Sequence, residues 1–298
     1  MKSNDDLEED RDVEVSIIMA AYNAADYILL SVQSVMNQTE RNWELLICDD
    51  HSYDGTWEII STITDARIKA IRNPFNQGVS ISRNRCLEMA KGEFIAILDA
   101  DDVWLENKVS LQLRLFRTNP LLGIVGTNAI EIDSSGLRIG FRDFPKSHKR
   151  LLDLGLWKSP MLHSSIMFRR SLGITSYDEQ LTTAEDWELL VRLMKVSESY
   201  VIQDRLVRYR VHSENLTHSK AMQMRADAFS VVRKTLIKSA AFTNSEIGAF
   251  ERLFQYQKLS HKQTMIGLRL FLKILRIQRG PETLRRFRWF LLSRIPRF

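Results

Sequence analysis

Three carboxylates follow one apolar run near the middle of the sequence. The string IAILDADD places the four apolar residues 95–98 directly before Asp99, Asp101 and Asp102. A short apolar run bounded by polar residues predicts a strand buried on both faces, so the three acids are expected together at its carboxyl end. Three mutually repelling carboxylates indicate a bound cation. The competing interpretation is a helix N-cap at Asp102, although a cap needs only one acid.

Strands and helices alternate on both sides of this run. Strands are predicted over 14–20, 43–50, 66–73 and 93–99, and helices over 26–38, 55–63 and 79–92. Such repeated βαβ units predict a mostly parallel sheet with helices on both faces, whose ligands bind at the carboxyl ends of the strands. Tyr22, Asn23, Asp49 and Asp50 fall at the same edge. The sequence has no GxGxxG and no GxxxxGK[ST], so a bound cation would have to hold any phosphates.

Four ordered segments carry a resemblance to a known family. They are VSIIMAAYNAADYILLSVQSVMNQT, WELLICDDHSYDGT, GVSISRNRCLEMAKGEFIAILDADDVW and TAEDWELLVRL. Together they resemble the family-two glycosyltransferases of the bacterial surface-polysaccharide type, over roughly residues 14 to 215. The resemblance implies an α/β GT-A nucleotide-diphospho-sugar transferase fold, with a mostly parallel central sheet flanked by helices and a basic C-terminal helical extension. The expected regions are a disordered acidic tail (1–12), the catalytic domain (13–218) and basic amphipathic helices (219–298).

The resemblance assigns one group of residues to the sugar-nucleotide donor. Tyr22 would stack on the base, and Asp50, supported by Asp49, would accept the uracil N3–H, which cytosine lacks. Asp99 would bind the ribose hydroxyls. The other expected donor contacts are Ala20, Arg83, Asn84 and Ala100. Competing interpretations are an amphipathic Tyr22 at a helix entrance, turn formation by the Asp49–Asp50 pair, and solvated polar side chains at Arg83 and Asn84.

A second group would hold the metal. By the same resemblance Asp101 binds Mn²⁺ or Mg²⁺ with help from Asp102, because hard divalent cations prefer carboxylate oxygens. His212 is placed to complete the coordination, but a lone histidine is as often structural.

The catalytic base is expected on a later helix. The resemblance gives this role to Asp186, which would take the proton of an acceptor hydroxyl. An acidic first turn is also what any helix prefers. Glu185, Trp187 and His163 are expected on the acceptor side, with strand capping as the alternative for His163.

Two departures from the family pattern concern the donor site. Asp50-His51-Ser52 stands where many members have the turn sequence DDGS, and Glu188 follows the Glu-Asp pair where many have another residue. They leave the proposed chemistry intact, but the sugar itself is not specified by the sequence.

Length and charge place the chain among globular proteins with a basic end. Its 298 residues hold 44% hydrophobic residues without a run of about 20 apolar residues, which a spanning helix needs. The acidic first dozen residues do not resemble a signal peptide, so a cytoplasmic location is expected. Cys48 and Cys86 form no CxxC pair and are expected in the core.

Positive charge is concentrated at the C-terminus. Residues 221–298 carry 16 Lys and Arg against 4 Asp and Glu, and Arg269, Lys273 and Arg276 recur on one helical stripe before the break at Gly280-Pro281. This pattern favours an amphipathic anchor on the inner face of the cytoplasmic membrane. A basic bundle packed on the catalytic domain is the alternative. No nucleic-acid recognition motif accompanies the charge.

These observations predict an inverting, metal-dependent glycosyltransferase. It would move a sugar from a UDP-sugar to a hydroxyl of a glycan acceptor, in particular a polyprenyl-diphosphate-linked one, and form a β-glycoside. A polyprenyl-phosphate sugar synthase and a non-catalytic nucleotide-sugar-binding protein are the alternatives.

Overall fold

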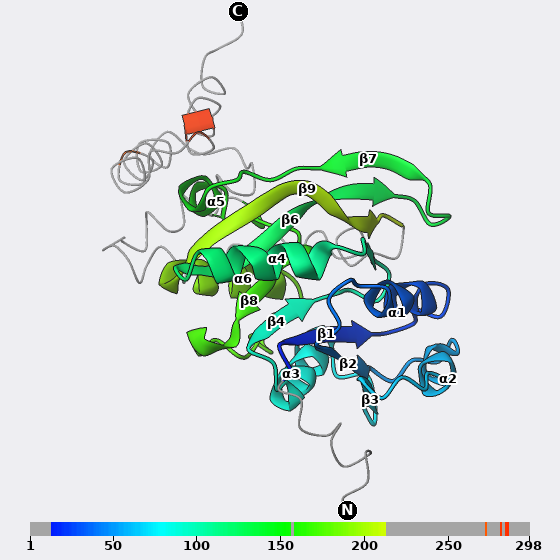
Figure 1. The fold of residues 1–298 in the computed structure, drawn as a ribbon. Helices are drawn as coiled ribbons and strands as arrows, with labels where there is room; N and C mark the ends of the chain where they lie inside the picture. The colour runs from blue at the N-terminus through cyan, green and yellow to red at the C-terminus, as the bar shows by residue number, and fades with distance from the viewer. Residues whose placement is uncertain (1–12, 156–157, 213–271, 273–280, 282–283, 286–298) are drawn as a thin grey trace, which may run out of the picture.

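The computed structural model describes residues 13–155 and 158–212, together with residues 272, 281, 284 and 285 (Figure 1). The predicted acidic tail, the predicted basic helical stripe with Arg269, Lys273 and Arg276, and the predicted boundary after residue 218 lie outside the described residues. Among the described residues, no helix is both long and apolar enough to span a bilayer.

One mixed sheet runs through the described part of the chain, in the order β3-β2-β1-β4-β8-β6-β9-β5, with β7 paired to β6. The strands are β1 (Val15–Ala21), β2 (Trp43–Asp49), β3 (Ile68–Arg72), β4 (Phe94–Ile97), β5 (Val103–Trp104), β6 (Leu122–Ile132), β7 (Arg138–Arg142), β8 (Met167–Arg169) and β9 (Glu198–Arg210). The β3-β2-β1-β4 half is parallel, as the βαβ pattern predicts, and β8 joins it to the second half by antiparallel pairing on both of its sides.

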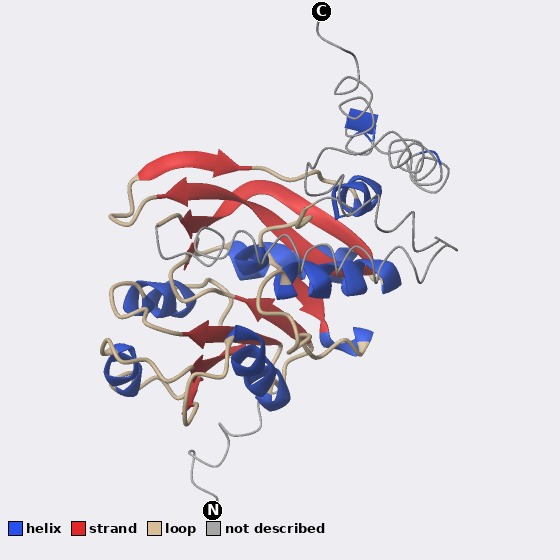
Figure 2. Cartoon of the chain, turned by 180° about the vertical axis from the view of Figure 1, so that it is seen from behind, coloured by secondary structure: helices blue, strands red, loops and turns tan. Residues whose placement is uncertain are grey.

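Helices cover both faces of this sheet (Figure 2). The helices are α1 (Ile28–Met36), α2 (Thr56–Ser61), α3 (Val79–Met89), α4 (Lys108–Thr118), α5 (His148–Gly155) and α6 (Glu185–Val196), with short 3-10 turns at His163–Ser165 and Arg170–Leu172. Side chains of α1, α2 and α4 share one hydrophobic cluster, and those of α3, α5 and α6 share the other. The sheet therefore lies between two hydrophobic layers.

The apolar spacing that predicted these helices corresponds to their buried faces. Ile28, Val32 and Val35 of α1 are buried, as are Val109 and the later apolar residues of α4. Cys48 and Cys86 are free and buried, as expected. Periodicity thus located the core correctly, since residues three and four apart share one side of a helix.

The structure excludes the competing interpretation of Asp102 and corrects one expected helix end. Asp102 does not cap α4, because the short strand β5 intervenes and Asn107 holds the N-cap position. Helix α3 stops at Met89 rather than at Gly92, because Ala90 already has extended backbone. Gly92 instead passes against β1, where a Cβ would lie 2.5 Å from the amide nitrogen of Ser16. Any larger residue would push the two segments apart.

Parallel pairing sets the position of the acidic residues. Ala21 is level with Asp49, and Ile18 is level with Ile97, so β1, β2 and β4 all end at one edge of the sheet. The chain leaves these strands with the residues predicted to bind ligand, and the carboxyl edge of the parallel half is therefore the place of the candidate site.

Lys108 is an unusual core residue at the start of α4. Its side chain is fully buried, donates a hydrogen bond from Nζ to Gln112 Oε1 at 2.9 Å, and lies 3.6 Å from the centre of the Trp104 ring. Burial lowers the pKa of Lys108 well below its usual range. Folding therefore favours the neutral amine more than the unfolded chain does.

We predict that Lys108 makes stability depend on alkaline pH. Its unfolded pKa is near 10.4, so between the lowered folded pKa and that value the unfolded chain binds up to one more proton than the folded chain, and the wild type loses stability relative to Lys108→Met as pH falls through this window. Within this window, the difference in unfolding free energy between the two proteins, measured in urea, should change by roughly 1 kcal/mol per pH unit. The control is Lys91→Met, at an exposed lysine. A difference in unfolding free energy that does not change with pH would show that Lys108 is charged in the folded protein.

Candidate active site

The loops after β1 and β2 are bound together before any ligand arrives. The amides of Asn23, Ala24 and Ala25 donate to Ser52 Oγ, Thr56 Oγ1 and Asp54 Oδ2 at 2.8–3.0 Å. These hydrogen bonds hold the loop that carries Tyr22, whose surface is 46% exposed. The Tyr53 ring packs edge-on against the Tyr22 ring, with the ring centres 6.2 Å apart. Tyr22 is thus presented as a supported aromatic platform.

Asp50 organises the loop that follows β3. Its carboxylate accepts hydrogen bonds from the Asn73 side chain and from the amides of Gln77 and Gly78, at 2.6–2.8 Å. The side chain is buried, so its predicted contact with uracil stays a prediction.

Asp49 is fully buried and pairs with Arg72 at 3.0 Å. This corrects its assignment to the donor surface: Asp49 stabilises the end of β2 from the interior.

A buried arginine joins the two acidic motifs. Arg83, on α3, donates from Nη1 to Glu185 Oε1 at 2.7 Å and from Nη2 to Asp99 Oδ1 at 2.8 Å. Burial would raise the pKa of Asp99, but the Arg83 charge and the neighbouring His163 hold that pKa well below its usual range. Asp99 is therefore ionised, and Arg83 fixes it relative to the start of α6.

His163 and Asn84 complete the surroundings of Asp99. His163 is buried, with Nδ1 3.6 Å from Asp99 Oδ1 and Nε2 2.9 Å from the Tyr177 hydroxyl. Asn84 is also buried and exchanges hydrogen bonds with the backbone of Tyr177 while donating to Glu179. Asn84, like Arg83, is therefore not the solvated side chain of the competing interpretation. Asn84 holds the segment before α6 against α3, and its predicted donor contact stays a prediction.

Asp101 and His212 meet from distant parts of the chain. Asp101 Oδ2 lies 3.0 Å from His212 Nε2, and the two side chains keep 25% and 15% of their surface exposed. No cluster of three or more candidate ligands occurs among the described residues. A carboxylate and an imidazole are nevertheless suitable ligands for Mn²⁺ or Mg²⁺, and a site with two protein ligands leaves positions for diphosphate oxygens and water. The residues present therefore fit the expected ion.

Asp102 does not belong to this pair. Its side chain is fully buried, and Oδ1 accepts the backbone N–H of Arg210 at 2.8 Å. Burial, together with the charges of Asp101 and Asp99, raises the pKa of Asp102 well above its usual range. Through Oδ1, Asp102 ties the end of β9 to the DADD loop, and its expected help in metal binding stays a prediction.

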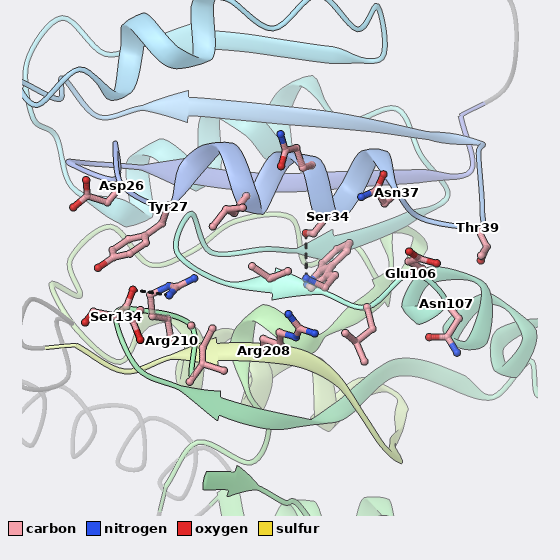
Figure 3. A pocket seen from close by; sticks show the side chains of 18 residues that line it. Asp26, Tyr27, Ser34, Asn37, Thr39, Glu106, Asn107, Ser134, Arg208 and Arg210 are labelled. Carbon is pink, nitrogen blue, oxygen red and sulfur yellow. Dashed lines mark hydrogen bonds between the residues drawn. The ribbon is translucent and has the colours of Figure 1, made fainter. Parts of the chain in front are cut away.

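Arg210 also connects the end of β9 to the DADD loop. Its Nε donates to the carbonyl of Asp101, and Nη1 donates to the carbonyls of Asp133 and Ser134. The guanidinium lies 4.4 Å from the centre of the Tyr27 ring, which also packs against His212. A pocket of about 790 Å³ adjoins these side chains, between α1, β5 and the β6–β7 turn (Figure 3).

Asp186 opens the first turn of α6 beside Glu185. It is partly exposed, whereas Glu185 is buried. Burial and the negative charge of Glu185 raise the pKa of Asp186, and His163 and Arg83 oppose this rise. A carboxylate with a raised pKa is a better proton acceptor, so the geometry suits a general base.

Trp187 faces the interior rather than a ligand. It is buried and donates from Nε1 to the carbonyl of Gly155 at 2.7 Å. Its assignment to the acceptor side is therefore corrected, because the indole has its partner inside the fold. Ala20 and Ala100 lie at the sheet edge as expected, and the Ala100 carbonyl accepts a hydrogen bond from Ser31.

Sequence reasoning missed Arg210, Tyr177 and Ser164. Ser164 Oγ accepts the amide of Asp99, so it too supports the DADD loop. Arg210 could have been suspected as a charged residue two positions before His212. Tyr177 and Ser164 had no local signal, because their partners are 14 or more residues away in the chain.

We predict that Arg83 is the main stabilising cation of the site. Arg83→Met would leave Asp99 and Glu185 without their shared partner, and breaking a buried ion pair in this way typically costs about 3–5 kcal/mol. Urea unfolding of the variant measures the loss. The matched control is Arg114→Met on the exposed side of α4, which should change stability by under about 0.5 kcal/mol. Equal effects of the two substitutions would contradict this role.

Comparison with known proteins identifies the family. The profile for "Glycosyl transferase family 2" matches residues 16–173. The putative glycosyltransferase EpsE of Bacillus subtilis is 30% identical over 236 residues, covering 76% of this chain and 81% of EpsE. The UDP-Glc:alpha-D-GlcNAc-diphosphoundecaprenol beta-1,3-glucosyltransferase WfaP of Escherichia coli is 44% identical over 119 residues, covering 40% of this chain and 47% of WfaP. The matched part thus spans about half of WfaP.

Solved structures agree on the fold. S. aureus TarS 1-349 in complex with UDP-GlcNAc superposes with a TM-score of 0.63 at 19% identity, covering 87% of this chain and 79% of TarS 1-349. The mannosyltransferase PcManGT of Pyrobaculum calidifontis, in complex with GDP-Man and Mn²⁺, gives 0.58 at 16% identity, with 95% and 81% covered. With its GT-A fold and its ordered acidic motifs, the chain belongs to glycosyl transferase family 2.

Proposed function

We propose that this protein is an inverting, metal-dependent glycosyltransferase that moves a sugar from a UDP-sugar to a hydroxyl of a lipid-linked glycan. The proposal rests on three groups of side chains at one edge of the sheet. They are the exposed Tyr22 ring, the Asp101–His212 pair, and the Asp186 carboxylate near Asp99 and Arg83. In such an arrangement a donor bound at the edge presents its sugar toward α6.

The donor would be held from both ends. Tyr22 offers its ring to the base, and Asp99, ionised beside Arg83, is a hydrogen-bond acceptor for ribose hydroxyls. Asp101 and His212 would hold the divalent ion, which when bound neutralises the charge that builds on the departing diphosphate. The sequence match to WfaP, whose name specifies UDP-Glc and a diphosphoundecaprenol acceptor, makes UDP-glucose the first donor to test.

The acceptor would be activated by Asp186. Its carboxylate removes the proton as the hydroxyl oxygen attacks the anomeric carbon from the side opposite the diphosphate. Attack from that side inverts the centre, so an α-linked donor gives a β-glycoside. Glu185 cannot take the same role while it is paired with Arg83. Its negative charge instead keeps the neighbouring Asp186 basic.

We place the reaction at the inner face of the cytoplasmic membrane. A polyprenyl-diphosphate acceptor is amphiphilic and resides there, and the basic region 219–298 would hold the enzyme beside it. This part of the proposal rests on the sequence of that region and on the acceptor named for WfaP.

We predict that metal-assisted nucleotide binding depends on Asp101 and His212. Calorimetry should show UDP binding that Mn²⁺ strengthens, and Asp101→Asn should weaken the Mn²⁺-dependent affinity at least about 10-fold because a charged ligand is lost. His212→Ala should weaken it as well. Asp204→Asn, an exposed acid on β9, is the matched control. Absence of Mn²⁺- or Mg²⁺-assisted binding of UDP in the wild type would overturn the proposal, and assisted binding of GDP alone would overturn the uridine assignment.

We predict that the titration of Asp186 sets the acid limb of the pH profile. Because its pKa is raised, kcat/KM should fall as pH decreases through a value above the usual 3.9 of an aspartate. Glu185→Gln removes the neighbouring charge and should move this limb to lower pH. Asp186→Asn should lower kcat by about 10²- to 10⁴-fold with UDP affinity unchanged.

The same variants distinguish the alternatives. Full transfer by Asp186→Asn would favour a polyprenyl-phosphate sugar synthase, whose phosphate acceptor needs little base assistance. Metal-dependent UDP binding without turnover of any UDP- or GDP-sugar would favour a nucleotide-sugar-binding protein.

A further inference from the structure

The carboxylate of Asp99 has one engaged oxygen and one open oxygen. Its Oδ1 accepts a hydrogen bond from Arg83 Nη2 at 2.8 Å and lies 3.6 Å from His163 Nδ1. Among the described residues no side chain or amide donates to Oδ2, and the Asp99 side chain keeps 29% of its surface exposed. Oδ2 is therefore the oxygen that a ligand can reach, and the contacts of Oδ1 set its direction.

The imidazole of His163 has one satisfied nitrogen and one unsatisfied nitrogen. Nε2 lies 2.9 Å from the Tyr177 hydroxyl. Nδ1 is buried, lacks a hydrogen-bond partner within the described part of the chain, and faces Asp99 Oδ1 at a separation longer than a hydrogen bond. A hydrogen on Nδ1 would attract the ionised oxygen, whereas a lone pair there would repel it. The position of the ring hydrogen thus decides whether His163 supports Asp99.

Tyr177 determines where this hydrogen lies. The side chain is buried, and burial together with the nearby carboxylates raises the pKa of Tyr177 well above its usual range, although the Arg83 charge opposes the rise. The phenol therefore keeps its hydrogen, and within the described residues its hydroxyl contacts His163 Nε2 alone. A buried hydroxyl donates to an acceptor within reach, so Nε2 accepts and the neutral ring carries its hydrogen on Nδ1.

The backbone holds both side chains in place. Ser164, next to His163 in a 3-10 turn, accepts the amide of Asp99 on its Oγ at 3.2 Å. The amide of Tyr177 donates to Asn84 Oδ1 at 2.7 Å, and its carbonyl accepts from Asn84 Nδ2 at 3.2 Å. The hydroxyl, the imidazole and the carboxylate are therefore aligned in the protein without a ligand.

We propose that Tyr177 and His163 are positioning residues: the Tyr177 hydroxyl fixes the Nδ1 hydrogen of His163 toward Asp99 Oδ1, so that Oδ2 is presented to a ribose hydroxyl of the donor. This assigns His163 to the donor side, in place of the acceptor-side role expected from the sequence. The choice of ligand rests on the proposed function, whereas the position of the ring hydrogen is a property of the free protein.

Nitrogen-15 NMR of the full chain with labelled histidine reads the ring hydrogen without any nucleotide. His163 is one of six histidines, and its signals are those that disappear in His163→Asn. At about pH 8, where an ordinary histidine is neutral, we expect a protonated Nδ1 and an unprotonated Nε2. Tyr177→Phe removes the donor and should move the ring toward the Nε2–H form, while Tyr200→Phe, outside the site, should not. In the wild type, a bare Nδ1 or a hydrogen on both nitrogens would overturn the proposal.

Calorimetry with two nucleotides measures the consequence for the ligand. UDP should bind more tightly than 2′,3′-dideoxy-UDP, which lacks both ribose hydroxyls, and His163→Leu and Tyr177→Phe should reduce this preference by about threefold or more. His163→Asn has nearly the shape of the leucine variant but can place an N–H where Nδ1 lies, so it should retain the preference.

The ratio of the two affinities separates positioning from general stability. A substitution that loosens the fold weakens both nucleotides alike and leaves their ratio unchanged. An unchanged ratio in His163→Leu, or an equal loss in His163→Asn, would contradict the inference. Absence of UDP binding by the wild type would overturn the proposed function together with the ligand named here, whereas a different position of the ring hydrogen would overturn this inference alone.

Discussion

The architecture of the site depends on one buried ion-pair arrangement, in which Arg83 binds Asp99 and Glu185 at the same time. The two acids come from motifs 86 positions apart in the sequence, one after β4 and one at the start of α6. Without a shared cation, burying both carboxylates would be costly, and each would tend to take up a proton instead. With it, the loop after β4 and the start of α6 keep a fixed separation.

Three neighbouring carboxyl groups at the site differ in the direction of their pKa shifts. Asp99, beside Arg83, remains ionised and is suited to accept hydrogen bonds, whereas Asp102, buried among other acids, favours its neutral form. Asp186 lies between these extremes, because burial and the charge of Glu185 raise its pKa while His163 and Arg83 oppose the rise. Identical side chains thus acquire different pKa values from their surroundings.

The fold supplies a rigid frame at the carboxyl edge of the parallel strands. The loops after β1 and β2 are joined by hydrogen bonds, so the nucleotide platform does not depend on a ligand to form.

The sequence by itself determined the alternating strands and helices, the carboxyl edge as the place of the site, and the family, because apolar periodicity and ordered motifs are local properties of the chain. Tertiary structure alone decided the roles of individual polar residues. Asp101 and Asp102 are adjacent and chemically identical, yet one reaches His212 and the other accepts the amide of Arg210 inside the fold. Likewise, nothing local indicates that Tyr177 meets His163. These assignments depend on burial and on partners far away in the chain. The spacing of residues in the sequence specifies neither of them.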